Sequence, residues 1–159
     1  IPLAIKTYRG TKQGDYTNLD VSNQMQRQKW YKTAVLLLIL VIAILYFTDQ
    51  SRSMRFNTIY AFLLLVTAQI INNYVKSSMH VAYNVFLTFM ILPIDTRAGI
   101  LFGVFVIIIA WSRLELKRHT FKEVVFGTLI GLTFGLISYF TTNAFGADMK
   151  NILLPLSSL

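Results

Sequence analysis

The sequence contains no cysteine, which excludes disulfide bonds, thiolate metal sites and cysteine nucleophiles in its 159 residues. It also lacks the alternation of apolar and polar residues that is typical of membrane β-strands. Acidic residues are few, with 7 Asp and Glu against 15 Lys and Arg, so the net charge is +8. Because the basic residues flank apolar segments and form no nucleic-acid-binding module, we expect them to face anionic lipid headgroups and not nucleic acid.

Continuous apolar sequence is what the chain has most of. Hydrophobic residues make up 55% of it and are gathered into runs of 15 or more with almost no charge. A soluble amphipathic helix would carry polar residues at every turn. The sequence therefore predicts an all-α, multi-span transmembrane helical bundle, an integral membrane protein.

The predicted bundle is a single membrane-embedded domain with a five-span core over residues 34–141. The expected spans, in chain order, are 34–47, 58–75, 81–92, 98–111 and 124–140. Residues 6–32 are polar and basic and predict a juxtamembrane loop, while residues 143–159 are expected to form a short tail. Residues 1–5 do not have the form of a signal peptide, and we expect them to be the end of an earlier span.

Three glycines lie on one face of the fifth expected span. Gly127, Gly131 and Gly135 are spaced by four residues. Small residues at this spacing allow two helix backbones to approach closely, so the pattern predicts tight packing against another helix of the bundle.

A polar stretch at residues 112–123 separates the last two expected spans. If the following helix has begun by His119, then His119 and Glu123 are spaced i and i+4, and the carboxylate can orient the imidazole. The alternative is that the cations of this stretch are plain interfacial anchors. Those cations are Arg113, Lys117, Arg118 and Lys122.

Counting membrane crossings brings three polar clusters to one face. Two spans lead from Arg27 to residues 76–80, and two more lead to residues 113–123. The chemically useful residues of this face are Arg27, Lys76, Ser77, Ser78, His80, Arg113, His119 and Glu123. Guanidinium and ammonium groups match the oxygens of a phosphate. With two histidines, one can attack phosphorus while the other protonates the leaving oxygen, a scheme that needs no metal or other cofactor.

The residues of the polar stretch also carry a family resemblance. Ser112-Arg113-x5-His119-x3-Glu123 resembles the third signature motif of the type 2 phosphatidic acid phosphatase superfamily, usually Ser-Arg-x5-His-x3-Asp. The resemblance implies that His119 is the nucleophile, that Glu123 takes the place of the orienting aspartate, and that Arg113 binds phosphate.

A second motif of the same family is similar to residues 77–80. Ser77-Ser78-Met79-His80 resembles a diverged Pro-Ser-Gly-His, which implies that His80 is the general acid. Ser78 either donates to phosphate or caps the N-terminus of the third span. Met79 replaces the glycine that allows backbone N–H groups to approach phosphate.

The first motif departs most from the family pattern of Lys-x6-Arg-Pro. Here Asp20-x6-Arg27-Gln28 has the arginine at the right interval but an acid in place of the lysine. Arg27 is a candidate phosphate ligand, and Lys76 is a candidate for the missing ammonium.

Three functions follow from these residues. The first is a metal-independent phosphatase or phosphotransferase that acts on a phospholipid or isoprenoid lipid phosphate or diphosphate through a phosphohistidine. The second is a catalytically degenerate member that binds anionic lipid or serves as a subunit of a membrane assembly or homo-oligomer. The third is a zinc hydrolase that uses His80, His119 and Glu123 as metal ligands. We rank it lowest, because the nearby cations would repel a divalent ion.

Overall fold

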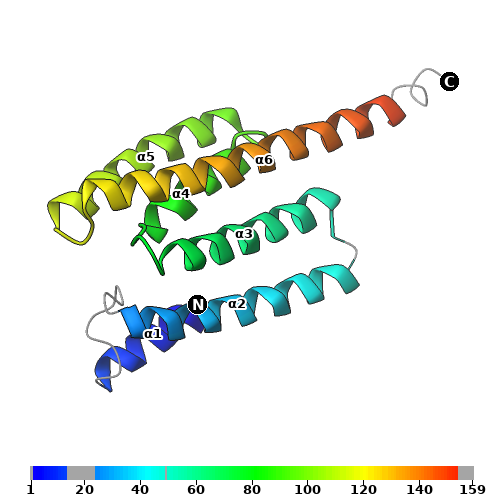
Figure 1. Ribbon diagram of the computed structural model, residues 1–159. Helices are drawn as coiled ribbons and strands as arrows, with labels where there is room; N and C mark the ends of the chain where they lie inside the picture. The colour runs from blue at the N-terminus through cyan, green and yellow to red at the C-terminus, as the bar shows by residue number, and fades with distance from the viewer. Residues whose placement is uncertain (1, 14–23, 49, 154–159) are drawn as a thin grey trace.

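The computed structural model describes residues 2–13, 24–48 and 50–153, and this part of the chain consists of helices and short connections without a β-strand. This confirms the all-α prediction. The six helices are α1 (Pro2–Lys12), α2 (Gln24–Phe47), α3 (Arg52–Ile71), α4 (Met79–Ile91), α5 (Thr96–Glu115) and α6 (Phe121–Leu153). Helices α2 to α6 lie side by side as an elongated bundle (Figure 1).

Three of these helices are long and apolar enough to cross a membrane, namely α3, α5 and the Phe121–Ala144 part of α6. Two shorter apolar segments, Tyr31–Phe47 and α4, accompany them. Helix α4 has 13 residues and is about 20 Å long, less than the roughly 30 Å of a hydrocarbon core. These helices mark the chain as a membrane protein.

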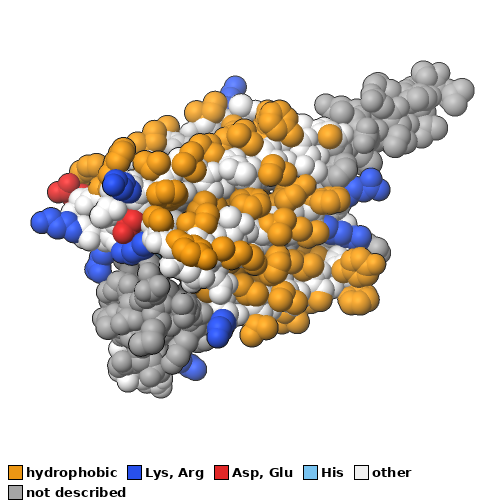
Figure 2. All heavy atoms as spheres, viewed as in Figure 1, with side chains coloured by type: hydrophobic (Ala, Val, Ile, Leu, Met, Phe, Trp, Pro, Cys, Tyr) orange, Lys and Arg blue, Asp and Glu red, His pale blue; other side chains and the backbone are white. Residues whose placement is uncertain are grey.

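The outer face of α5 suits contact with lipid acyl chains. Hydrophobic side chains cover much of the bundle surface, while Lys, Arg, Asp and Glu gather mainly toward its ends (Figure 2). The exposed hydrophobic residues of α5 are Ile100, Leu101, Val104, Phe105, Ile107, Ile108 and Trp111.

Two predicted irregular segments are largely helical. Helix α1 and the first residues of α2 occupy most of the described part of the predicted loop at 6–32. Gln, Met, Arg and Lys at residues 24–29 are good helix formers, so their polarity marks the end of a helix that continues beyond the apolar run. At the other terminus, α6 continues to Leu153 through most of the predicted tail and extends past the rest of the bundle (Figure 1).

The glycines of α6 pack directly on α4, as the sequence predicts. A Cβ atom at Gly127 would lie 2.5 Å from the carbonyl oxygen of Ser78, and one at Gly131 would lie 2.5 Å from that of Ala82. Both distances are well below van der Waals contact, so only glycine allows this approach. Gly135 continues the stripe against the next turns of α4. Helices α4 and α6 therefore run parallel in tight contact.

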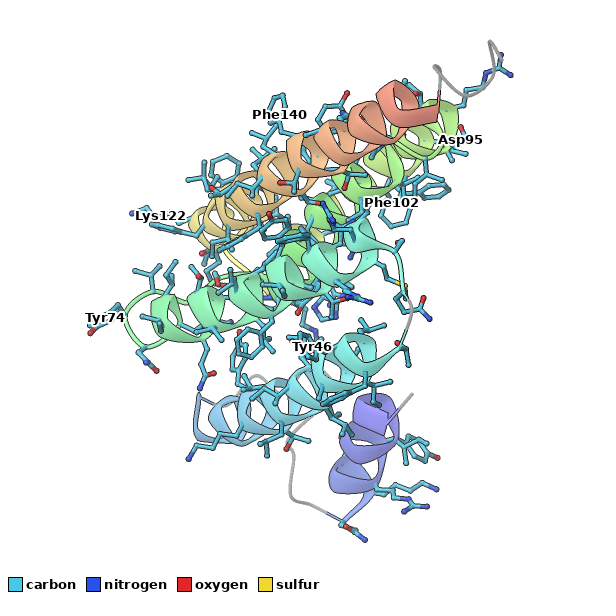
Figure 3. All side chains as sticks on the ribbon, turned by 90° about the vertical axis from the view of Figure 1, so that its right-hand side faces the viewer. Tyr46, Tyr74, Asp95, Phe102, Lys122 and Phe140 are labelled. Carbon is cyan, nitrogen blue, oxygen red and sulfur yellow. The ribbon has the colours of Figure 1, made fainter. Side chains whose placement is uncertain are left out.

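Buried apolar side chains join the remaining helices to this pair. Leu64 and Ala68 of α3 pack with α4 and α6, and Val106 of α5 packs on their other side. Tyr31 of α2 contacts the bundle through a cluster that includes Leu65. Because α4 and α6 are parallel, their N-termini meet at one end, where the Ser78 N–H donates to the carbonyl oxygen of Glu123 at 3.0 Å. Lys122 and Tyr74 lie at this end, and Asp95 lies at the opposite one (Figure 3).

Candidate functional site

The connection between α5 and α6 begins with a tight turn at the end of α5. Lys117 has a φ of 51°, in the left-handed region that usually favours glycine. Its N–H donates to the carbonyl oxygen of Leu114 at 2.9 Å, and the N–H of Arg118 donates to that of Arg113 at 3.1 Å. These two bonds form a Schellman motif, which ends α5 and satisfies its last carbonyls. The N–H of His119 also donates to the Arg113 carbonyl, at 3.2 Å, which fixes the backbone of His119.

Helix α6 starts with a capping box that the sequence analysis overlooked. The Glu123 N–H donates to Thr120 Oγ1 at 3.4 Å, and the Thr120 N–H donates to Glu123 Oε2 at 3.3 Å. A Thr followed by a Glu three residues later is a known signal for this motif, and it was present in the sequence. The helix therefore begins at Phe121, three residues before the expected span at 124–140 and two residues after His119.

The predicted contact between His119 and Glu123 is nevertheless present. His119 Nδ1 lies 2.7 Å from Glu123 Oε2, and both side chains are largely buried, with 14% and 16% exposed. Because a carboxylate can only accept, Nδ1 carries the hydrogen of this bond. In the neutral imidazole the lone pair is then on Nε2, the nitrogen that can act as a nucleophile or base.

Lys76 reaches the same carboxylate from the connection between α3 and α4. Its Nζ lies 3.5 Å from Glu123 Oε2 and donates to the carbonyl oxygen of Arg118 at 3.2 Å. The predicted convergence of residue 76 with the stretch at 113–123 is therefore correct. The convergence brings an ammonium, a carboxylate and an imidazole together.

Burial lowers the pKa of His119 below its ordinary value of 6.5. The hydrogen bond and the negative charge of Glu123 oppose this effect, while the positive charges of Lys76 and Arg113 add to it. The net direction is downward, which favours the neutral imidazole, the form in which Nε2 has a lone pair.

Polar groups also fix the connection that carries Lys76. Asn72 Oδ1 accepts from the Ser77 N–H at 2.8 Å, and Asn72 Nδ2 donates to the hydroxyl of Tyr31. Ser77 and Ser78 are buried, and their hydroxyls have no hydrogen-bond partner among the described residues. Ser78 occupies the N-cap position of α4, but its hydroxyl forms no capping bond there.

The other predicted site residues occupy different surroundings. His80 is exposed on the first turn of α4, where its carbonyl oxygen accepts from Asn84 at 2.6 Å. Arg113 is half-buried in the last turn of α5, and its positive charge contributes to lowering the pKa of His119. Arg27 lies near the start of α2, and its side chain is outside the described residues.

A metal-binding set is not formed by the described side chains. In that part of the chain no group of three or more His, Cys, Asp and Glu residues is placed to hold a metal ion. His80 is therefore not arranged with His119 and Glu123 as the ligand set of a zinc hydrolase, which the third hypothesis requires.

Fold and site together define a helical membrane protein with a His–Glu–Lys cluster at one end of its bundle. Comparison with protein-family models, with curated proteins and with solved structures finds no match to this chain. The chemistry of the cluster is therefore what carries a functional argument.

Proposed function

We propose that the protein is a membrane-bound phosphatase or phosphotransferase that acts on a lipid phosphate or diphosphate through a phosphohistidine at His119, without a metal. The observation that carries this proposal is the 2.7 Å contact between His119 Nδ1 and Glu123 Oε2. It supports a neutral imidazole whose Nε2 has the lone pair needed to attack phosphorus.

In the proposed first step, Nε2 of His119 attacks phosphorus. A P–N bond forms as the P–O bond to the leaving group breaks, and His80 donates the proton that the leaving oxygen needs. Glu123 stabilises the positive charge that develops on the imidazole, and the guanidinium groups of Arg113 and Arg27 hold the non-bridging oxygens. In the second step, His80 takes a proton from water, whose oxygen forms a P–O bond as the P–N bond breaks, and inorganic phosphate is released.

The surroundings of the site support a substrate held in the membrane surface. Leu116 and Phe121 flank the connection between α5 and α6, and their side chains are exposed. The exposed cations of this end would attract an anionic headgroup. These are Lys117, Arg118 and Lys122. We therefore propose phospholipid or isoprenoid phosphates as the substrates, in the bacterial inner membrane.

The test is phosphate release in detergent, in the presence of EDTA, from a panel of lipid phosphates and diphosphates. We expect turnover by the intact chain, and a loss of at least about 10³-fold in His119→Ala because the nucleophile is removed. Glu123→Gln is a matched variant, since glutamine preserves the capping box but removes the charge. We expect it to fold normally and to lose roughly 10²-fold in turnover, within the range of a positioned acid–base group.

Trapping provides a second readout. Brief incubation with a ³²P-labelled substrate should give an acid-labile, base-stable label on the intact chain and none on His119→Ala. A label that persists in His119→Ala would assign the nucleophile to another residue and contradict the proposal.

An alternative is that the protein is a catalytically inactive relative of the phosphatase superfamily that it resembles. Such a protein would bind anionic lipid without turnover or serve as a subunit of a membrane assembly. The exposed position of His80 favours it, because a general acid is usually held close to the leaving group. This alternative predicts no phosphate release from any lipid of the panel, and the same binding of anionic lipid before and after His119→Ala.

A further inference from the structure

We propose that Lys76 is a positioning residue whose ammonium holds the Glu123 carboxylate for His119, and that it does not act as a phosphate ligand. Its effect on catalysis depends on the function proposed above. Its effect on the His119–Glu123 pair does not, and can be measured without any substrate.

The geometry centres on one oxygen atom. Glu123 Oε2 lies 2.7 Å from His119 Nδ1, 3.3 Å from the Thr120 N–H nitrogen and 3.5 Å from Lys76 Nζ. Two of these groups precede α6, whereas Lys76 comes from the connection before α4. Lys76 therefore ties the carboxylate to a second part of the bundle.

The backbone on the C-terminal side of Lys76 is fixed at this place. The Ser77 N–H donates to Asn72 Oδ1 at 2.8 Å, and the Ser78 N–H donates to the Glu123 carbonyl at 3.0 Å. The Lys76 ammonium also donates to the Arg118 carbonyl at 3.2 Å. Two contacts of the ammonium are thus directed into the protein, toward a carbonyl and a largely buried carboxylate, which leaves one of its three donors. This pairing favours the positioning role.

Charge balance gives the expected consequence. The charged groups that act on the His119 imidazole are Glu123, Lys76 and Arg113. Glu123 favours the imidazolium, and the two cations disfavour it. Without the Lys76 charge, the carboxylate would keep its contacts with the Thr120 N–H and the imidazole, and a larger share of His119 would be protonated. Lys76 thus keeps the nucleophile in its neutral form while it holds the carboxylate in place.

The first experiment is an NMR titration of histidine side chains in the detergent-solubilised full chain. The chain has two histidines, and His119→Ala assigns their signals. We expect the pKa of His119 to rise in Lys76→Met and to stay unchanged in Lys76→Arg, which preserves the charge. Lys122→Met is the matched control, because it removes an exposed cation from the first turn of α6. A His119 pKa that is the same in Lys76→Met and in the wild type would overturn the proposal.

Lys76→Gln is titrated in parallel, since its amide can still donate to the Arg118 carbonyl and it provides a neutral variant if Lys76→Met does not fold. A rise of the His119 pKa in the neutral variant that folds supports the proposal.

The second experiment measures kcat and KM against pH for the same variants. We expect the acid limb of kcat to move to higher pH in Lys76→Met, with a loss of about tenfold on that limb and an unchanged KM. A raised KM with an unchanged pH profile would identify Lys76 as a phosphate ligand and overturn the positioning role. If the intact chain shows no turnover while the NMR shift is present, the proposed function fails and the role of Lys76 in the pair stands.

Discussion

Two polar clusters sit at opposite ends of the same helices, and they differ in charge. At the N-terminus of α6, Lys76, His119 and Glu123 meet around one carboxylate oxygen. Toward the other end of the span, Ser138 of α6 donates to Asn57 Oδ1 of α3 at 2.8 Å, and both residues are buried. The first cluster contains a titratable imidazole, whose pKa is lowered below 6.5 by burial. The second contains neutral groups that do not titrate near this pH.

The neutral cluster has the character of a structural link. Tyr60 and Thr141 share a hydrogen bond of 3.1 Å between their hydroxyls, next to the pair of Asn57 and Ser138. In a membrane, polar groups of neighbouring helices pair with one another because lipid offers no partner. The charged cluster instead leaves the hydroxyls of two adjacent buried serines without a partner in the described chain. The side chains of the neutral cluster are thus paired with one another, which is typical of a structural contact.

The largest effect is expected from disturbing the helix pair that carries both clusters. Gly127→Val would place a side chain 2.5 Å from the Ser78 carbonyl oxygen, a backbone atom that cannot move away alone. Gly135→Val would meet the side chain of Phe89, which can rotate. We expect Gly127→Val to lower the free energy of unfolding by about 3 kcal/mol or more, as strong overpacking does, and Gly135→Val to lower it by less. Unfolding in mixed detergent measures both, and an equal loss would contradict the packing described here.

Ser138→Ala tests the neutral cluster by itself. The substitution leaves Asn57 Oδ1 buried without its donor, which typically costs about 1–3 kcal/mol. Because neither group titrates, the loss should be the same from pH 5 to pH 8. Thr133→Val, at an exposed position of α6, is the control and should change the stability little. A loss in Ser138→Ala that varies with pH would mean that the two clusters are coupled.

The charged cluster should make stability depend on pH. The pKa of His119 is lower in the folded state than its ordinary 6.5, so below pH 6.5 the folded protein binds fewer protons than the unfolded one. The contribution of His119 to the free energy of unfolding is therefore complete above pH 6.5 and is lost as the pH falls. The slope is at most about 1.4 kcal/mol per pH unit for one proton. Unfolding of the wild type and of His119→Gln between pH 5 and 8 measures this. A wild-type slope that persists in His119→Gln would assign it to another group.

Local patterns in the sequence predicted part of this arrangement. The spacing of Gly127, Gly131 and Gly135 predicted a close helix contact, and the interval from His119 to Glu123 predicted their pairing. The pairing holds although His119 precedes the first residue of α6, because the capping box folds the Glu123 side chain back toward the residues before the helix.

Long-range features had no local signal. Asn57 and Ser138 are 81 residues apart, and each is an ordinary polar residue in its own segment. The contact of Lys76 with Glu123 requires the first turns of α4 and α6 to lie next to each other. The glycine contacts between the two helices fix this alignment. Polarity was also misleading at residues 24–32, which are part of helix α2 and not of a loop.

The smallest effect is expected from Thr120→Ala, which separates the capping role of this segment from its chemistry. The bond from the Glu123 N–H to Thr120 Oγ1 is long, at 3.4 Å, so its loss should cost only about 0.5 kcal/mol, the low end for an N-cap. The backbone N–H of Thr120, which donates to Glu123 Oε2, is kept in this variant. The carboxylate should thus remain beside His119, and the pH dependence of stability should persist. Thr120→Ser is the control that retains the hydroxyl, and both variants are followed by unfolding at pH 5 and pH 8. If Thr120→Ala removed the pH dependence, the cap and not Lys76 would be what holds Glu123 in place.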